Sequence, residues 1–138
     1  MTISDDRDGG VATAETVLVV EDDVLVRLVI AGYLRECGYR VIEAASADEA
    51  VRLLQRDDLR IDVVLTDVEM PGTMDGFALA HWLRRERPDV EVVMAGTPAR
   101  AADAAGELCD EGPSLARPQP PSAVLARIRR LLAMRRQP

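Results

Sequence analysis

The chain has 138 residues and 48% of them are hydrophobic, which suits one domain with an ordinary buried core. Its net charge of −7 argues against a dedicated nucleic-acid-binding protein, because such proteins usually carry a basic excess. All 17 basic residues are arginines, so a mechanism that needs a lysine amine is excluded. The start is acidic and glycine-rich, and no apolar run reaches membrane-spanning length. We therefore expect a cytoplasmic protein with no membrane partner.

Strand-like and helix-like segments alternate five times along the chain. In chain order we expect a strand at 16–20, a helix at 24–36, a strand at 40–44, a helix over 46–54, a strand at 61–66, a helix at 75–87, a strand at 90–95, a helix at 98–109, a weak strand at 114–116 and a helix at 122–134. Short connections between alternating elements predict an α/β fold, with a parallel sheet covered by helices on both faces.

Several helix boundaries carry local signals. Gly38 suits a left-handed cap after the first helix, Ser46 with Glu49 forms a capping box before the second, and Pro88 ends the third. Residues on one face of the first helix are expected to be Leu25, Leu28, Val29 and Gly32.

Acidic residues follow the first and third strands. Glu21, Asp22 and Asp23 end the first, and Asp67 ends the third. In a doubly wound sheet, sites form beyond the carboxyl ends of strands, so we expect at least three carboxylates to converge. Mg²⁺ is the natural cation for such a cluster of oxygen ligands. Solvated loop residues are the alternative, and Asp23 is expected only to cap the first helix.

An aspartate beside Mg²⁺ can act as a passive ligand or can attack a phosphoryl group and carry it as an acyl phosphate. The stretches VLVVEDD and LTDVEMPGTMDGF, with the fivefold alternation, resemble the receiver domain of two-component response regulators, the CheY-like family. The resemblance implies a flavodoxin-like (βα)5 fold with strand order 2-1-3-4-5 over residues 16–134. We expect 1–15 to be a mobile lead-in and 135–138 a short basic tail, with no output domain.

The resemblance also implies roles for individual residues. Asp67 would be the phosphoacceptor, Asp22 a direct Mg²⁺ ligand, Glu21 a second acidic partner acting through water, and the Glu69 backbone carbonyl a further ligand. The donor would be a histidine kinase or phosphotransfer protein, and the signal would pass to a downstream protein. The chain would not be an enzyme beyond slow self-dephosphorylation, and the fourth and fifth helices would offer a homodimer face.

Two positions depart from the family pattern beside the phosphoryl group. Receivers carry Thr or Ser after the fourth strand, where this chain has Gly96 followed by Thr97. Either the hydroxyl is lost, which we favour on strand register, or Thr97 stands in for it. The usual Lys before a Pro is Arg117, which keeps the charge but has a planar, permanently protonated group able to pair with phosphate in a bidentate manner.

Two further departures concern the switch and the loop. The aromatic switch position falls on Ser114, and MPGTMDG is one residue longer than the family pattern. We therefore predict that Asp67 accepts phosphate while the usual coupling is weak or rewired. A pseudo-receiver that acts as a phosphorylation-independent interaction module remains the alternative, and a Mg²⁺-dependent phosphohydrolase is a weaker one.

The remaining polar residues suggest no second site. Cys37 and Cys109 lie far apart without a CxxC motif, so we expect two buried or half-buried thiols and no disulfide. With His81 as the lone imidazole, zinc is not expected, and His81 itself should face solvent. Arginines crowd the last helix, where they indicate a solvated face or, alternatively, an anionic partner; they are Arg127, Arg129, Arg130, Arg135 and Arg136.

Overall fold

The computed structural model describes residues 15–112 and 119–136. Its four described strands form one parallel sheet in the order β2-β1-β3-β4. The strands are β1 (Thr16–Val20), β2 (Arg40–Ala44), β3 (Val63–Asp67) and β4 (Glu91–Ala95). The helices are α2 (Val24–Glu36), α3 (Ala47–Leu54), α4 (Gly76–Glu86), α5 (Pro98–Glu111) and α6 (Pro121–Arg135). This arrangement confirms the α/β class, the parallel sheet and the first four places of the expected strand order.

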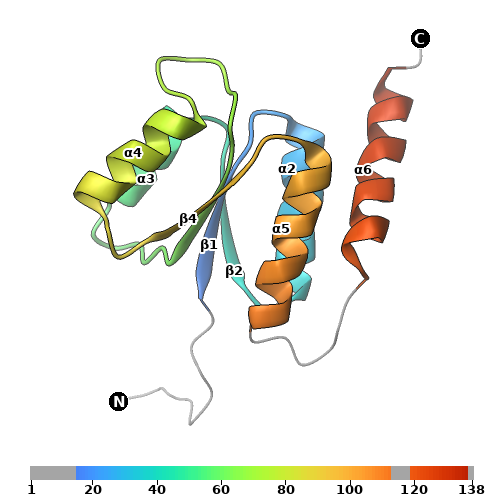
Figure 1. Cartoon of the computed structure of the whole chain (residues 1–138), viewed down its shortest axis with the longest axis horizontal. Coiled ribbons are helices and arrows are strands. Elements are labelled where there is room, and N and C mark those ends of the chain that lie inside the picture. The colour runs from blue at the N-terminus through green and yellow to red at the C-terminus, as the bar shows by residue number, and fades with distance from the viewer. Residues whose placement is uncertain (1–14, 113–118, 137–138) are drawn as a thin grey trace, which may run out of the picture.

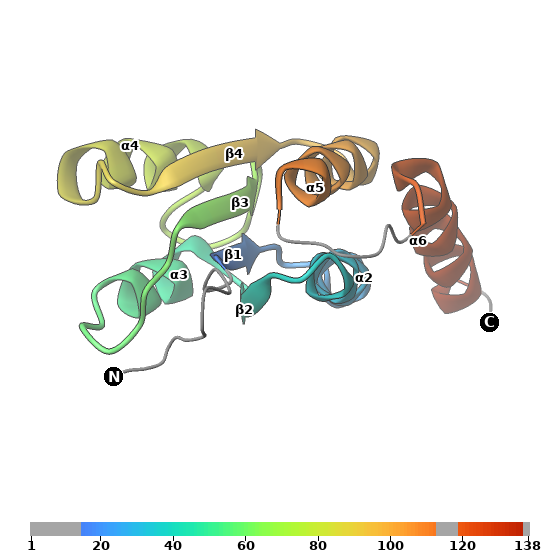
Figure 2. The ribbon, with the colours of Figure 1, turned by 90° about the horizontal axis from the view of Figure 1, so that it is seen from below.

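Helices cover both faces of the sheet, as Figures 1 and 2 show. On one face, α3 and α4 pack over Leu18, Val20 and Val64. On the other, α2 and α5 pack over Val17 and Val19. Neighbouring residues of β1 therefore enter opposite cores, as the period-two geometry of a strand requires. Burial on both faces explains why this strand is apolar throughout.

The last helix forms an outer layer. Figure 2 shows α6 lying beyond α2 and α5, and it makes its contacts with these two helices. Val124 and Ile128 enter the core from α6. Gly106 of α5 allows a close approach, because a Cβ built there would lie 2.2 Å from Cγ of Pro121. None of the helices within the described ranges has the length and apolar character to span a bilayer.

The local signals for helix ends are confirmed. The Ser46 hydroxyl accepts from the Glu49 N–H, while the Glu49 carboxylate accepts from the Ala45 N–H, so a capping box of slightly shifted register is present. Gly38 has a φ of 97°, the left-handed conformation expected after α2.

The predicted face of α2 is only partly correct. Leu28 is 52% exposed, and Leu25 and Gly32 are only partly buried. Val29 is buried as expected, and the other large apolar side chains that enter the core are Val26, Ile30, Tyr33 and Leu34. Both sets have helical spacing, and the packing of α5 and α6 beside α2 decides which face is covered.

The prediction of two free thiols is also wrong. Cys37 and Cys109 form a disulfide, with their Cα atoms 5.3 Å apart although they are 72 residues apart in sequence. The pairing arises because α2 and α5 lie side by side on one face of the sheet. The expected fifth strand at 114–116, with Ser114 and Arg117, lies outside the described residues.

Candidate functional site

Three carboxylates meet at the carboxyl edge of the sheet. β1 and β3 are adjacent and parallel, so Glu21 and Asp22, just beyond β1, come beside Asp67 at the end of β3. One oxygen from each carboxylate lies within 4.8 Å of the others. Glu21 and Asp67 are half-buried and Asp22 is exposed. The structure thus brings together the three acidic side chains that the sequence analysis selected.

Burial raises the pKa of two of the three carboxyl groups. Burial, reinforced by the negative charges of Asp67 and Asp22, raises the pKa of Glu21 to about 8, although the Asp23 N–H opposes this by donating to Glu21 at 2.9 Å. Burial also raises the pKa of Asp67, against the N–H groups of Val68 and Glu69 that donate to its carboxylate. The raised pKa of Glu21 favours a proton on this carboxyl at neutral pH, and the Glu21 side chain opposes the rise in the pKa of Asp67. A divalent cation would replace this proton, so the donor set fits Mg²⁺.

Two arginines hold the acidic loop after β1. The Arg27 guanidinium donates to the Glu21 carbonyl at 2.9 Å and pairs with Glu43 at 3.2 Å. Arg135 of α6 donates to both oxygens of Asp23, at 2.8 and 3.2 Å. Asp23 also caps α2 as predicted, accepting from the N–H groups of Leu25 and Val26. From the sequence, Arg135 was named only within the arginine series of the last helix and Arg27 was not selected, so neither contact with the acidic loop was predicted.

The start of α4 lies directly against the end of β3. Asp75 caps α4 by accepting from the Ala78 N–H at 2.9 Å, and the Gly76 N–H donates to the Val68 carbonyl at 2.9 Å. A Cβ built at Gly76 would lie 2.1 Å from the Asp67 carbonyl oxygen. The Asp-Gly pair therefore has a physical function, since glycine alone lets the helix approach the strand that carries Asp67.

The lengthened loop between β3 and α4 has its own anchor. Gly72 has a φ of 110°, a conformation that favours glycine. The Thr73 hydroxyl donates to the Asp48 carboxylate at the start of α3, with distances of 2.9 and 3.0 Å. The extra residue of MPGTMDG is thus accommodated by a left-handed turn and a hydrogen bond to a neighbouring helix.

The residues after β4 follow the register partner of Asp67, and the first of them, Gly96, has no side chain. Ala95 is the register partner of Asp67, and a Cβ built on the next residue, Gly96, would make ordinary contacts with Val68 at 3.6 and 3.9 Å. Thr97 is exposed and caps α5, its hydroxyl oxygen accepting from the Arg100 N–H at 3.1 Å. The Thr97 hydroxyl oxygen therefore caps the N-terminal end of α5, while its O–H group is still able to donate.

The other selected residues have varied surroundings. Glu69 is exposed and its N–H donates to Asp67, while the role of its carbonyl as a metal ligand stays a prediction. His81 faces solvent on α4, as expected. Chemically, the arrangement offers a half-buried nucleophilic carboxylate beside two further acidic side chains at an open sheet edge.

Comparison with known proteins gives the family. The model of the response regulator receiver domain matches residues 17–114. The sensor kinase CckA of Brucella abortus is 41% identical over 78 residues, which are 56% of this chain and 8% of that protein. The chain spans less than a quarter of the length of the curated relatives it matches first.

Solved structures show the same relationship. The response regulator TrrA of Thermotoga maritima, in complex with Mg²⁺ and BeF, has 28% identity and a TM-score of 0.54, covering 59% of this chain and 68% of TrrA. The chemotaxis response regulator CheY4 of Vibrio cholerae has 27% identity and a TM-score of 0.57, covering 86% of this chain and 99% of CheY4. With the family model matching well over half of its length, the chain belongs to the receiver domain family of two-component response regulators.

Proposed function

We propose that this receiver accepts a phosphoryl group on Asp67 from a histidine kinase or phosphotransfer protein and signals through protein contacts. The observation that carries the proposal is the convergence of Glu21, Asp22 and Asp67 within 4.8 Å at the carboxyl edge of the sheet. The relative TrrA has been crystallised with Mg²⁺ and BeF, and also with the histidine kinase ThkA. These complexes of a relative support a metal-assisted phosphoryl site and a kinase partner for the present chain.

The chemistry follows from the position of Asp67. An oxygen of its carboxylate attacks the phosphorus of the donor, an acyl phosphate forms, and the bond from phosphorus to the donor histidine breaks while that imidazole recovers a proton. When bound, Mg²⁺ neutralises negative charge on the phosphoryl oxygens. Asp22 and Glu21 would hold the ion together with Asp67 and the Glu69 carbonyl. The N–H groups of Val68 and Glu69 orient the Asp67 carboxylate.

Partner surfaces adjoin the site. Val24 and Leu28 are 46% and 52% exposed on α2, directly after the acidic loop, and Phe77 is 59% exposed at the start of α4. We assign Val24 and Leu28, which are four residues apart and so share one face of α2, to contact with the phosphodonor protein, because adjoining exposed apolar side chains mark protein contacts. A groove of about 310 Å³ lies between the first residues of α5 and the side of α6, and Pro98 and Leu132 are among its lining residues. We assign it to a downstream partner or a second copy of the chain.

The pseudo-receiver is the second candidate, and one observation favours it. No hydroxyl reaches the phosphoryl position from Gly96, and the Thr97 hydroxyl caps α5. In that case the acidic cluster would still bind a cation, but phosphorylation would not alter the surface offered to a partner.

Amide chemical shifts with Mg²⁺ and beryllofluoride, a phosphoryl mimic, separate the two candidates. The phosphoacceptor function predicts shifts at residues 21–23 and 67–69 that Asp67→Asn abolishes. Spread of these shifts to residues 95–111 would show that the signal reaches α5. Identical spectra with and without beryllofluoride would contradict the phosphoacceptor function and favour the pseudo-receiver.

A further inference from the structure

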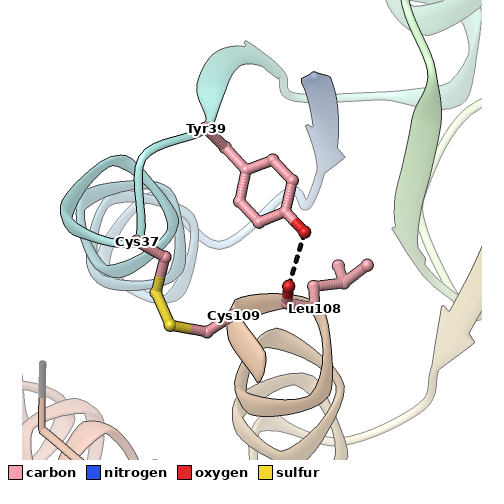
Figure 3. The surroundings of a disulfide bond; sticks show 4 residues. All are labelled: Cys37, Tyr39, Leu108 and Cys109. Atoms are coloured by element: carbon pink, nitrogen blue, oxygen red, sulfur yellow. Dashed lines mark hydrogen bonds between the residues drawn. A yellow bond between two sulfur atoms is a disulfide. The ribbon is translucent and has the colours of Figure 1, made fainter. Parts of the chain in front are cut away.

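The Cys37–Cys109 disulfide joins the far ends of the two helices that leave the acidic site. Cys37 ends α2 as its cap, and Cys109 lies in the last turn of α5. The opposite ends of these helices start at the site, where α2 follows Asp22 and Asp23 and α5 follows Gly96. Figure 3 shows the bond crossing directly from one helix end to the other.

The buried face of α5, a helix of 14 residues, consists mostly of small side chains. Apart from Leu108 its buried residues are small, and they are Ala101, Ala102, Ala105, Gly106 and Cys109. Alanine buries little apolar area, so this interface supplies less hydrophobic stabilisation than one built from leucine or isoleucine. The disulfide therefore adds a covalent link between α5 and α2 to an interface of modest hydrophobic stabilisation.

The surroundings of the disulfide are closely fitted. The Tyr39 hydroxyl, on the segment between α2 and β2, donates to the Leu108 carbonyl of α5 (Figure 3). Gly112 lies against the Tyr39 ring, where a Cβ would come within 2.7 Å of the ring and its hydroxyl oxygen. Cys37 is fully buried and Cys109 is 5% exposed. A reductant therefore gains access when the last turn of α5 opens.

We propose that this pair is a redox modification site, a clasp whose oxidation holds α5 on α2 and whose reduction frees α5 to move. Reduction takes a dithiol. One of its thiolates attacks Cys109 Sγ, the S–S bond breaks, and Cys37 Sγ leaves as a thiolate that takes up a proton. The second thiol of the dithiol then attacks the reductant's sulfur in the mixed disulfide, and Cys109 Sγ leaves as a thiolate that takes up a proton. Two protein thiols and one oxidised reductant result.

The clasp has a consequence for signalling, and this part rests on the proposed function. When the disulfide fixes the C-terminal end of α5, this helix moves less when a phosphoryl group binds near its N-terminal end. Reduction should therefore let the Asp67 site move α5 and the groove between α5 and α6. In a reducing compartment, disulfides are usually transient and redox-sensing, which fits a reversible clasp.

Hydrogen exchange of the full chain tests the clasp without any ligand. Thiol alkylation under denaturing conditions should find no free thiol in the oxidised protein and two after dithiothreitol. Amides of α5 should exchange faster by about tenfold or more after reduction, those of α4 should not change, and the melting temperature should fall on the order of 10 °C. Dithiothreitol should leave a Cys37→Ala, Cys109→Ala double variant unchanged.

Two outcomes would overturn the clasp. One is two alkylatable thiols in protein held under oxidising conditions, and the other is equal exchange of α5 in both redox states. A second experiment records amide chemical shifts of the oxidised and the reduced protein with Mg²⁺ and beryllofluoride, with Asp67→Asn as control. The shifts of α5 amides should be larger in the reduced protein. Equal shifts in both states would overturn the link to signalling. Absence of any shift at Asp67 would instead contradict the proposed function, while the exchange measurement still decides the clasp.

Discussion

Gly76 lies so close to Asp67 that a Cβ at Gly76 would fall 2.1 Å from the Asp67 carbonyl oxygen. The first residue of α4 thus rests on the backbone of the proposed phosphoacceptor. We expect Gly76→Ala to lower the free energy of unfolding by about 1–3 kcal/mol, because the added methyl group pushes helix and strand apart. Urea unfolding measures the loss, and weaker Mg²⁺ binding should accompany it.

Gly32 offers a matched control for this substitution. It lies within α2, and a Cβ built there meets nothing within 4 Å. Gly32→Ala should therefore stabilise the protein by up to about 1 kcal/mol through helix propensity. Equal effects of the two Gly→Ala changes would contradict the close contact at Gly76.

Restoring the missing hydroxyl should strengthen phosphoryl recognition. A Cβ at Gly96 makes only ordinary contacts with Val68, so Gly96→Ser should fold normally. A hydrogen bond from its hydroxyl to a fluorine of beryllofluoride, which stands in for a phosphoryl oxygen, should raise the affinity by about tenfold. Gly96→Ala adds the same carbon without the oxygen and should have little effect. Equal affinities of the Gly96→Ser and Gly96→Ala variants for beryllofluoride would contradict this interpretation of Gly96.

Mg²⁺ affinity should depend on pH through Glu21. Because the folded pKa of Glu21 is raised to about 8 from 4.5, the metal must displace a proton at neutral pH. Calorimetry should show affinity rising with pH and levelling off above about pH 8, with proton release below that value. Glu21→Gln should bind Mg²⁺ more weakly but with a flatter pH profile, and a steep profile in this variant would contradict the assignment.

The same pKa predicts how pH alters stability without metal. A raised folded pKa means that the contribution of Glu21 is fully present below its unfolded pKa of 4.5 and is lost as the pH rises through about 8. Mg²⁺ should offset this loss because it binds the folded state alone. Thermal melts across this range, with and without Mg²⁺, measure both effects.

The Arg135–Asp23 ion pair should tie α6 to the acidic loop. The hydrogen bonds from Arg135 lower the pKa of Asp23 below 3.8, so the pair contributes stability above that value that is lost as the pH falls. Arg135→Ala should raise the pKa of Asp23 and shift acid unfolding to higher pH, whereas Arg130→Ala on the same helix should not. Identical acid-unfolding curves for the two variants would contradict a stabilising role of the Arg135–Asp23 ion pair.

Asp23 has a second role that can be separated from the ion pair. Asp23→Asn keeps a good N-cap for α2 but loses the charge, while Asp23→Ala loses both. The Ala variant should therefore be less stable than the Asn variant by about 1 kcal/mol. Comparison of their urea midpoints checks this difference.

Local features of the fold could be predicted from the sequence because they depend on neighbours along the chain. The capping box at Ser46 and the left-handed Gly38 are examples, as are the strands that end in acidic residues. The convergence of Glu21, Asp22 and Asp67 also followed, since adjacent parallel strands bring their carboxyl ends together.

Long-range packing could not be predicted in the same way. Leu28 and Val29 are equally apolar, and only the positions of α5 and α6 expose the first and bury the second. The Cys37–Cys109 pairing depends on α5 lying beside α2, which no spacing within either helix reveals. The contact of Gly76 with the Asp67 backbone has the same origin.

The most direct test of the central claim is transfer of a phosphoryl group to Asp67. The chain is incubated with Mg²⁺ and a small acyl phosphate donor, and phosphorylated peptides are mapped by mass spectrometry. We expect one phosphoryl group on Asp67, dependent on Mg²⁺, removed by hydroxylamine and absent from Asp67→Asn. No transfer to the wild-type chain, or equal labelling of the wild-type and Asn proteins, would contradict the assignment of Asp67 as the phosphoacceptor.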